Sequence, residues 1–196
     1  PPAKMDHAMY TILAFGNSLT AGFGVPEDKS FAAGLDRALQ QEGFSARVIN
    51  GGVSGDTTFE AQPRLKGLLR YEPDLVLVEL GANDLLMGLP ANTVRANLES
   101  LVDTCLDTGA DVLLAGVLSL QGMDENHTER FHASYADLAQ SRNITLIPDF
   151  LPDIPGDPEL TLPDGLHPNE AGIEQIVRTV LPYVRPFLAA SPEKSP

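Results

Sequence analysis

Residues 75–80 read Leu-Val-Leu-Val-Glu-Leu, a short run of mostly aliphatic side chains. The apolar residues are nearly continuous rather than alternating, which is typical of a strand that is buried on both faces of a sheet. Four further short apolar runs precede or follow it along the chain. The five expected strands are therefore Tyr10–Phe15, Arg47–Asn50, Leu75–Leu80, Val112–Val117 and Ile144–Ile147.

The longer segments between these runs carry helical spacing. In residues 93–107, for example, Val94, Leu98, Leu101, Val102 and Cys105 fall on one helical face. Strands that alternate with helices predict an α/β fold, in which a parallel sheet is layered between helices. The expected helices are Phe31–Gln41 after the N-cap Ser30, Thr58–Arg70, Thr93–Asp107, Glu129–Arg142 and Glu170–Leu188. Pro182 and Pro186 are expected to kink or end the last helix.

The chain of 196 residues fits a single domain, and no change in composition marks a boundary. Residues 1–9 and 191–196 are expected to be peripheral tails. A net charge of −14 argues against nucleic acid and anionic membrane surfaces as partners. The single cysteine, Cys105, excludes an intrachain disulfide and is expected to be a buried apolar thiol.

Membrane, metal and cofactor signals are all missing from the sequence. No stretch of 18 apolar residues predicts a membrane span. No H-x-x-x-H or Cys/His cluster predicts a metal, and no G-x-G-x-x-G or G-x-x-x-x-G-K-[ST] loop follows a strand. We therefore expect no metal and no cofactor.

The first expected strand runs into Phe-Gly-Asn-Ser-Leu-Thr-Ala-Gly at 15–22. A serine in a glycine-flanked turn directly after a buried strand can present its hydroxyl at the carboxyl edge of the sheet, where open α/β sheets bind ligands. Ser18 is therefore a candidate nucleophile. A simple surface turn is the alternative, because serine is common in turns.

Two further strand ends carry groups suited to binding an oxyanion. The second strand leads into Asn-Gly-Gly-Val-Ser-Gly-Asp-Thr-Thr at 50–58, where three glycines let backbone amides approach a ligand closely. The third ends in Glu-Leu-Gly-Ala-Asn-Asp at 79–84. The side chain of Asn83 can point its NH₂ at a developing oxyanion, although a helix cap is the more usual role of asparagine.

The sequence Asp-Gly-Leu-His-Pro-Asn at 164–169 precedes the last helix. Asp164 lies three residues before His167 and can bond the ring Nδ1, which leaves Nε2 free to accept a serine proton. His7, His127 and His132 are poorer candidates, because His7 lies in the expected tail and the other two lie around the start of a polar helix with no obvious orienting carboxylate.

These four segments, in this order, resemble the SGNH, or GDSL-type, hydrolase family, in particular its bacterial thioesterase I, lysophospholipase L1 and arylesterase branch. The similarity extends from about Tyr10 to Leu188. Ser18, Gly55, Asn83 and His167 stand where the family has its four name-giving residues.

The resemblance implies a flavodoxin-like three-layer α/β/α sandwich with a five-stranded parallel sheet in the order 2-1-3-4-5. It also implies a Ser18–His167–Asp164 triad and an oxyanion hole made of the Ser18 and Gly55 N–H groups with the Asn83 side chain. One position departs from the family pattern, which has aspartate where this chain has Asn17. We expect this change to tune the activity rather than abolish it.

The implied function is hydrolysis of short- to medium-chain acyl esters, with a small-molecule ester as the partner. Leu85, Leu86, Met87 and Leu89 are expected to line an acyl pocket, the alternative being that they pack under the third helix. A thioesterase, a lysophospholipase or a carbohydrate deacetylase would use the same machinery. From other classes, a non-catalytic binding module and a flavin- or nucleotide-binding domain share the scaffold.

Two expectations concern the protein in its surroundings. We expect a monomer or a weak homo-oligomer without integral membrane association. A periplasmic or secreted location after removal of a signal peptide is slightly favoured over the cytoplasm.

Overall fold

A five-stranded parallel sheet forms the centre of the structure, a computed structural model that describes residues 9–191. The strand order β2-β1-β3-β4-β5 is the one expected, so the predicted fold class is confirmed. The strands are β1 (Tyr10–Gly16), β2 (Ala46–Gly52), β3 (Leu75–Glu79), β4 (Asp111–Ala115) and β5 (Thr145–Ile147). The expected tails lie outside the described residues except for Met9 and Ser191.

Burial separates the central strands from the edge strands. Every residue of β1 and β3 is buried, which explains why their sequences are mostly apolar. The edge strand β2 is only partly buried and ends in two glycines that are poor strand formers. Gly51 and Gly52 nevertheless pair with Phe15 and Gly16, so β2 extends two residues beyond its expected end at Asn50.

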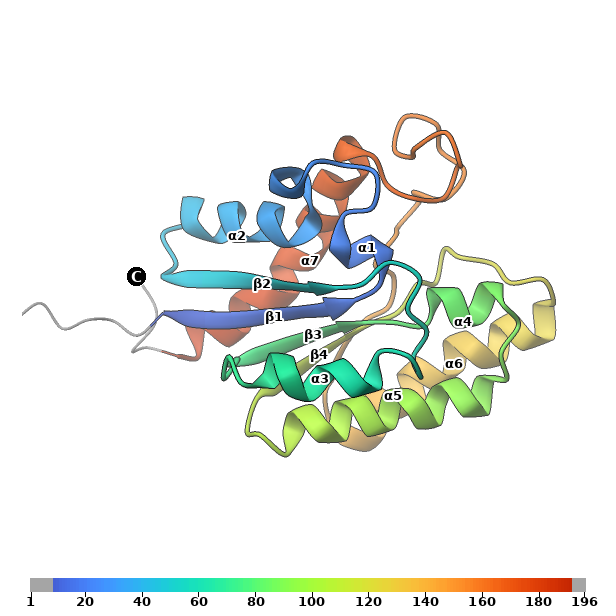
Figure 1. Ribbon diagram of the computed structural model, residues 1–196, viewed down its shortest axis with the longest axis horizontal. Helices are drawn as coiled ribbons and strands as arrows, with labels where there is room; N and C mark the ends of the chain where they lie inside the picture. The colour runs from blue at the N-terminus through green and yellow to red at the C-terminus, as the bar shows by residue number, and fades with distance from the viewer. Residues whose placement is uncertain (1–8, 192–196) are drawn as a thin grey trace, which may run out of the picture.

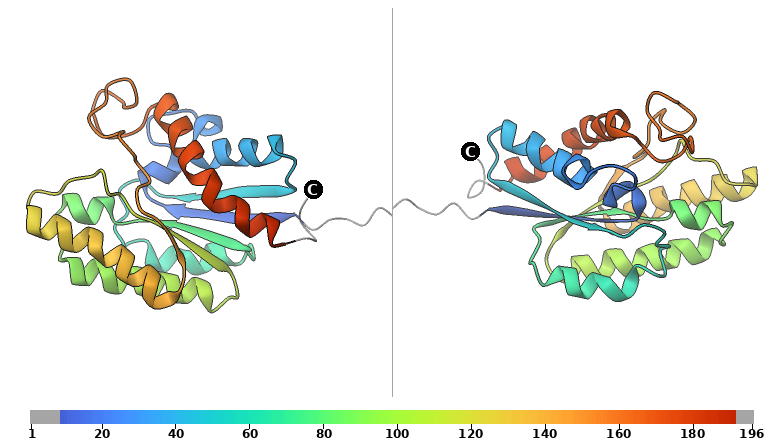
Figure 2. Two further views of the ribbon diagram at one scale, coloured as in Figure 1. Left: turned by 180° about the vertical axis from the view of Figure 1, so that it is seen from behind. Right: turned by 45° about the horizontal axis from the view of Figure 1, so that its top comes forward.

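Helices cover both faces of the sheet (Figures 1 and 2). One layer contains α2 (Phe31–Gln41) and α7 (Glu170–Ala189), which pack together, with the short α1 (Ser18–Ala21) beside them. The other contains α3 (Gln62–Leu69), α5 (Ala91–Leu106) and α6 (Glu125–Arg142). The 3₁₀ turn η1 (Glu27–Lys29) and the short α4 (Ala82–Leu86) lie in loops that follow β1 and β3.

Two helix starts differ from their expected positions for identifiable reasons. The helix expected from Thr58 begins at Gln62, because the Thr58 N–H and hydroxyl are bonded to Asp84 on another segment. The helix expected from Glu129 begins at Glu125, because the Asp124 side chain caps it by accepting a hydrogen bond from the His127 N–H at 2.7 Å.

The last helix does not end at either proline. Helix α7 continues through Pro182 and Pro186 to Ala189, one residue beyond its expected end at Leu188, so neither proline ends it. Each proline removes one backbone donor, yet the segment keeps an apolar face that is buried in the core. The buried residues that continue on this face are Val180, Leu181, Val184 and Leu188.

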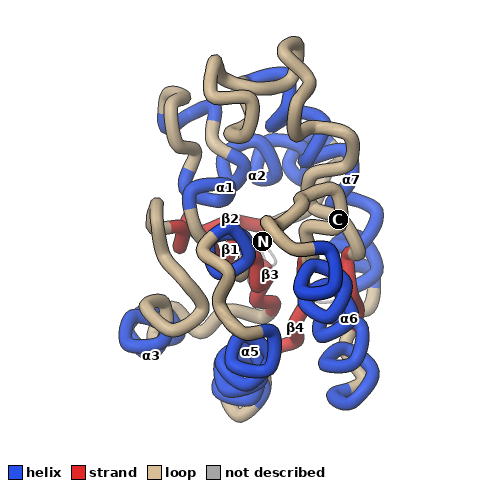
Figure 3. Tube along the Cα trace, turned by 90° about the vertical axis from the view of Figure 1, so that its right-hand side faces the viewer, coloured by secondary structure: helices blue, strands red, loops and turns tan. Residues whose placement is uncertain are grey.

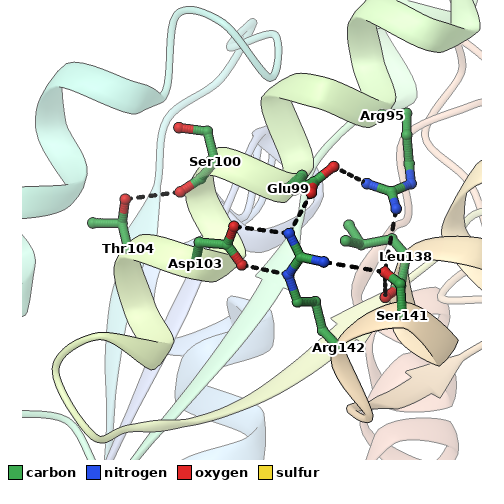
Figure 4. A network of polar contacts seen from close by, with 8 residues as sticks. All are labelled: Arg95, Glu99, Ser100, Asp103, Thr104, Leu138, Ser141 and Arg142. Carbon is green, nitrogen blue, oxygen red and sulfur yellow. Dashed lines mark hydrogen bonds and ion pairs between the residues drawn. The ribbon is translucent and has the colours of Figure 1, made fainter.

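Helices α5 and α6 are joined by a network of ion pairs (Figure 4). The Arg142 guanidinium on α6 bonds the carboxylates of Glu99 and Asp103 on α5. Arg95 bonds Glu99 at 2.5 Å and the Ser141 hydroxyl at 3.2 Å. On the buried face of α5, Cys105 is fully enclosed, which confirms the expected buried thiol, and burial raises the pKa of this thiol to about 12.

The loops that follow the strands gather at one edge of the sheet, which Figure 3 shows from the front. The segments that follow β1, β2 and β3 lie at this edge, together with the long segment between β5 and α7. Within residues 9–191, every helix is too short or too polar to cross a membrane. The same residues contain no cluster of three or more His, Cys, Asp or Glu side chains suited to a metal ion.

Candidate active site

Ser18 lies at the junction of a buried strand and a short helix. Strand β1 ends at Gly16, and α1 begins at Ser18 with Asn17 as its cap. The Asn17 Oδ1 accepts a hydrogen bond from the Leu19 N–H at 3.0 Å, which fixes the turn. The Ser18 Oγ lies 3.1 Å from the His167 Nε2. The fold thus joins a hydroxyl and an imidazole that are 149 residues apart in the chain.

His167 is held by a carboxylate from its own turn. The Asp164 Oδ2 lies 2.5 Å from the His167 Nδ1. The other oxygen, Oδ1, accepts hydrogen bonds from the N–H groups of Leu166 and His167 at 2.9 and 3.0 Å. The Leu166 N–H, followed by the His167 ring, lowers the pKa of Asp164 below its ordinary value. A carboxylate at Nδ1 places the ring proton there and leaves Nε2 as the acceptor that faces Ser18.

Phe23 is a neighbour of the imidazole that sequence reasoning missed. Its ring centroid lies 4.4 Å from that of His167, with 40° between the ring planes. The side chain is 49% exposed, so one part of the ring covers His167 and the rest faces solvent. No spacing rule connects residue 23 with residue 167, and only the fold shows the contact.

Gly55 lies in the loop after β2 and Asn83 in the short helix α4, and a hydrogen bond connects the two segments. The Asn83 Nδ2 donates a hydrogen bond to the Asp56 carbonyl at 2.8 Å, directly after Gly55. An amide nitrogen carries two hydrogens, so this bond orients the side chain and leaves the second N–H for a ligand. At the start of the same loop, the Val53 N–H donates to the Gly16 carbonyl at 3.0 Å. The loop that contains Gly55 is therefore fastened to the ends of both β1 and β3.

A buried carboxylate next to Asn83 holds the loop from its other side. Asp84 is fully enclosed and accepts hydrogen bonds from the Thr58 N–H at 3.0 Å and the Thr58 hydroxyl at 2.6 Å. The Asn97 Nδ2 also donates to this hydroxyl, at 3.1 Å. Asp84 thus joins α4 to the loop after β2. The aspartate was part of the quoted sequence motif, but its partner Thr58 is 26 residues away.

Arg64 on α3 is a second anchor that sequence reasoning missed. Its guanidinium pairs with Asp56 at 2.7 Å and donates to the carbonyls of Gly51 and Gly16 at 2.6 and 2.7 Å. It also lies over the ring of Phe15, 4.3 Å from the centroid. One side chain therefore links the ends of β1 and β2 to the residue after Gly55. The expected helix contained Arg64, but no pattern indicated these acceptors.

The glycine that precedes Asn83 is required by packing and by backbone conformation. Gly81 has a φ of 118°, a backbone angle that residues with a side chain rarely adopt. A Cβ at this position would lie 1.9 Å from the Tyr135 hydroxyl, which donates to the Leu80 carbonyl. The close approach of α6 thus fixes the direction in which the chain leaves β3 and enters α4.

The four expected acyl-pocket residues divide into two groups. Leu86 and Met87 follow Asn83 by three and four residues, so they lie on the same side of α4, and they are 39% and 62% exposed. Leu85 points the other way and is fully buried in the core, so it is a packing residue rather than a pocket residue. Leu89 is partly buried against the core.

The other histidines form bonds that hold loops. The His127 Nε2 lies 2.6 Å from the Leu89 carbonyl, and the His132 Nε2 lies 3.0 Å from the Leu120 carbonyl. Burial lowers the pKa of His132 below its ordinary value. His7 lies outside the described residues. Among the described histidines, His167 therefore has the contacts expected of a general base.

A hydroxyl bonded to an imidazole, which is in turn bonded to a carboxylate, is the arrangement of a serine hydrolase. An α/β sandwich presents it at the carboxyl edge of the sheet, as the fold rule requires. The chain belongs to the GDSL-like lipase/acylhydrolase family, whose model matches residues 14–174. The resemblance found in the sequence is thereby confirmed.

The chain is similar to several characterised hydrolases over most of its length. It is 39% identical to an arylesterase of Vibrio mimicus, over 84% of this chain and 82% of that protein. It is 34% identical to the esterase TesA of Pseudomonas aeruginosa, over 92% and 90% of the two chains. The structure of the psychrotrophic esterase EstA from Pseudoalteromonas, solved with monoethylphosphonate as inhibitor, matches with a TM-score of 0.85 and 30% identity, over 91% of this chain and 98% of that chain.

Proposed function

We propose that this protein is a serine esterase in which Ser18 is the nucleophile, His167 the general base and Asp164 the residue that orients the imidazole. The observation that carries the proposal is the continuous chain of contacts from the Ser18 Oγ through the His167 ring to the Asp164 carboxylate. The similarity to an arylesterase and to the esterases TesA and EstA supports the choice of ester as substrate.

In the first half-reaction, the Ser18 Oγ attacks the acyl carbonyl carbon and its proton passes to the His167 Nε2. Asp164 stabilises the imidazolium that forms. When the tetrahedral intermediate collapses, the imidazolium protonates the departing alcohol, and the acyl group remains on Ser18. In the second half-reaction, a water molecule gives its proton to His167 and attacks the acyl carbonyl, which releases the acid and restores the Ser18 hydroxyl.

The negative oxygen of each intermediate needs donors that are already in place. The Ser18 N–H is at the first position of α1 and has no acceptor within that helix. The Asn83 amide is oriented by its bond to the Asp56 carbonyl. Gly55, in the loop anchored by Arg64 and Asp84, supplies the third N–H. We assign the oxyanion hole to these three groups.

The acyl chain meets an open apolar surface in this arrangement. Phe23 lies against the His167 ring, and Leu86 and Met87 are exposed on the Asn83 side of α4. These three exposed apolar side chains, one against His167 and two on the helix that carries Asn83, suit contact with a short or medium acyl chain. The thioesterase, lysophospholipase and carbohydrate deacetylase alternatives differ in the leaving group rather than in the triad.

A substrate profile tests the proposal. p-Nitrophenyl esters with acyl chains of 2 to 12 carbons are compared with acyl-CoA thioesters, a lysophospholipid and an acetylated sugar. We expect the highest kcat/KM among the short and medium p-nitrophenyl esters, with loss of turnover in Ser18→Ala. A preference for the thioester, lysophospholipid or acetyl sugar would replace the ester assignment with that alternative. Equal turnover by the Ser18→Ala variant would overturn the assignment of the nucleophile.

A further inference from the structure

The mechanism above leaves one buried acid beside the nucleophile unexplained. Glu79 is the last residue of β3 and is only 1% exposed. Its partner in the neighbouring strand is Gly16, two residues before Ser18. The Glu79 carboxyl is therefore located at the base of the turn that carries the nucleophile, in the part of the sheet where β1 and β3 end together.

The carboxyl is bonded directly to this turn. The Thr20 hydroxyl in α1 donates to the Glu79 Oε1 at 2.8 Å, and both groups are buried. Gly16 leaves the space for this bond, because a Cβ there would lie 2.2 Å from the Thr20 Oγ1 and 2.7 Å from the Glu79 Oε1. Because Gly16 has no side chain, Glu79 at the end of β3 can accept a hydrogen bond from Thr20 in α1.

The surroundings of Glu79 contain polar donors but no cationic partner. Among the described residues, no ion pair includes its carboxylate. Burial raises the pKa of Glu79 to about 8, and the neighbouring polar groups of Thr20 and Asn17 lower it by less than burial raises it. A buried carboxyl that accepts hydrogen bonds from the residues of a turn can stabilise the conformation of that turn.

Asn17 takes part in the same cluster. Its Nδ2 and the Glu79 Oε2 are the buried side-chain atoms that lack a hydrogen-bond partner within residues 9–191. The Asn17 Oδ1 is used as the cap of α1, so its NH₂ is the end left for the Glu79 carboxyl. An amide at this position brings a donor toward the acid, whereas a carboxylate would bring a negative charge into the same buried cluster.

We propose that Glu79 is a positioning residue for Ser18: through its bond to Thr20 and its contact with Asn17, it holds the turn that directs the Ser18 hydroxyl toward His167. This inference rests on the proposed function, because it assigns the purpose of the cluster to the reaction at Ser18. Glu79 touches neither the substrate nor the reacting atoms and acts through the backbone of α1.

The test compares four variants with the wild type. Glu79→Leu removes the acceptor, Glu79→Gln keeps an oxygen that accepts from Thr20, and Thr20→Val removes the donor with little change in shape. Thr11→Val is the matched control. Thr11 is a buried threonine like Thr20, but it lies near the start of β1, at the end of the strand away from Ser18. For each variant, kcat and KM are measured with p-nitrophenyl butyrate, together with the rate of phosphonylation of Ser18 by a p-nitrophenyl phosphonate and the melting temperature.

We expect Glu79→Leu to lower kcat and the phosphonylation rate by about thirtyfold or more while KM stays within twofold, because small misplacements of a nucleophile are costly. Thr20→Val should lower both rates by about fivefold to tenfold, and Glu79→Gln should recover most of the activity lost in Glu79→Leu. Thr11→Val should react at the wild-type rate. If Glu79→Leu does not fold, the comparison between Thr20→Val and Thr11→Val carries the test.

Wild-type rates in a folded Glu79→Leu protein would overturn the proposal, as would equal rates for Thr20→Val and Thr11→Val. Failure to recover activity in a folded Glu79→Gln protein would also overturn it, because Gln keeps the oxygen that Thr20 needs. These results differ from a failure of the proposed function, in which the wild type itself hydrolyses no ester and its Ser18 is not phosphonylated.

Discussion

The two halves of the active site are built in different ways. The half with His167 is local: Asp164 bonds the backbone of its own turn and the ring three residues later, and the side chains are 41% and 23% exposed. The half with Ser18 is buried and depends on distant segments. Thr20 bonds Glu79 over 59 positions, and Arg64 bonds the Gly16 carbonyl over 48 positions.

This difference shows which contacts orient the side chains in each half of the site. A short loop with its own carboxylate can orient an imidazole without much help from the rest of the fold. The proposed nucleophile and the three proposed oxyanion donors come from different strand ends, so they must be aligned by the sheet and by side chains that cross between loops. Substitutions in the His167 half should therefore affect chemistry with little effect on stability, whereas those in the Ser18 half should affect both.

The largest effect short of removing the nucleophile is expected for Asp164→Asn. The amide can present the wrong group to Nδ1, so the tautomer needed at Nε2 is lost, and kcat should fall by about 10³- to 10⁴-fold. Because Asp164 is exposed, the melting temperature should change little. Steady-state kinetics and thermal unfolding check both statements. A fall of less than tenfold would show that His167 does not need this carboxylate.

Asn83→Ala should have the next largest effect. Removal of one oxyanion donor costs on the order of 3 kcal/mol of barrier, so turnover should fall by about a hundredfold or more with the fold intact. The measurement is kcat for a p-nitrophenyl ester, with circular dichroism as the control for folding. An unchanged rate would remove Asn83 from the mechanism.

Arg64→Met is expected to have a smaller effect on rate and to act on both properties. The variant loses the pair with Asp56 and the bonds to two carbonyls, so the loop that contains Gly55 is less well fixed. We expect kcat to fall by about tenfold and the free energy of unfolding by about 1–3 kcal/mol.

The control for this variant is Arg142→Met, which removes an ion-paired arginine between α5 and α6 (Figure 4). It should lower stability without changing kcat. If the two arginine variants lost activity to the same extent, a general loss of stability would explain the effect of Arg64→Met.

The pH dependence of stability should reveal the acid under the nucleophile. The pKa of Glu79 is about 8 in the folded protein against an ordinary value of 4.5, so between these values the folded state binds the proton more tightly than the unfolded state. The free energy of unfolding should therefore fall as pH rises from 4.5 to 8, at about 1.4 kcal/mol for each unit between the two pKa values.

Urea unfolding at pH 5.0 and pH 8.5 measures this loss in the wild type and in Glu79→Gln, which does not titrate. We expect the wild type to lose about 2 kcal/mol or more beyond the loss of the variant. Equal losses in the two proteins would show that Glu79 is ionised throughout this range.

The sequence pattern predicted the five strands of the sheet, and the family resemblance implied their order and the contacts of Ser18 and Asp164 with His167. Because β1 and β3 are buried on both faces, their sequences are runs of mostly apolar residues that are easily recognised. The helix Phe31–Gln41 has the predicted bounds, with a capping serine before it. Asp164 and His167 were found because their contact is encoded within four residues.

The sequence could not predict features that depend on contacts between distant residues. The partners of Glu79, Arg64 and Asp84 become visible only when strand ends meet. Leu85 was grouped with Leu86 because both follow Asn83, but the short helix α4 turns one into the core and the other to the surface.

The central claim is that the hydroxyl of Ser18 is made reactive by its contact with His167. Stoichiometric inactivation by a p-nitrophenyl phosphonate, followed by peptide mass spectrometry, tests it most directly. We predict release of one nitrophenolate per chain, complete loss of esterase activity, and a single phosphonylated residue at Ser18. Inactivation without modification of Ser18, or full ester turnover after Ser18 is modified, would contradict the account.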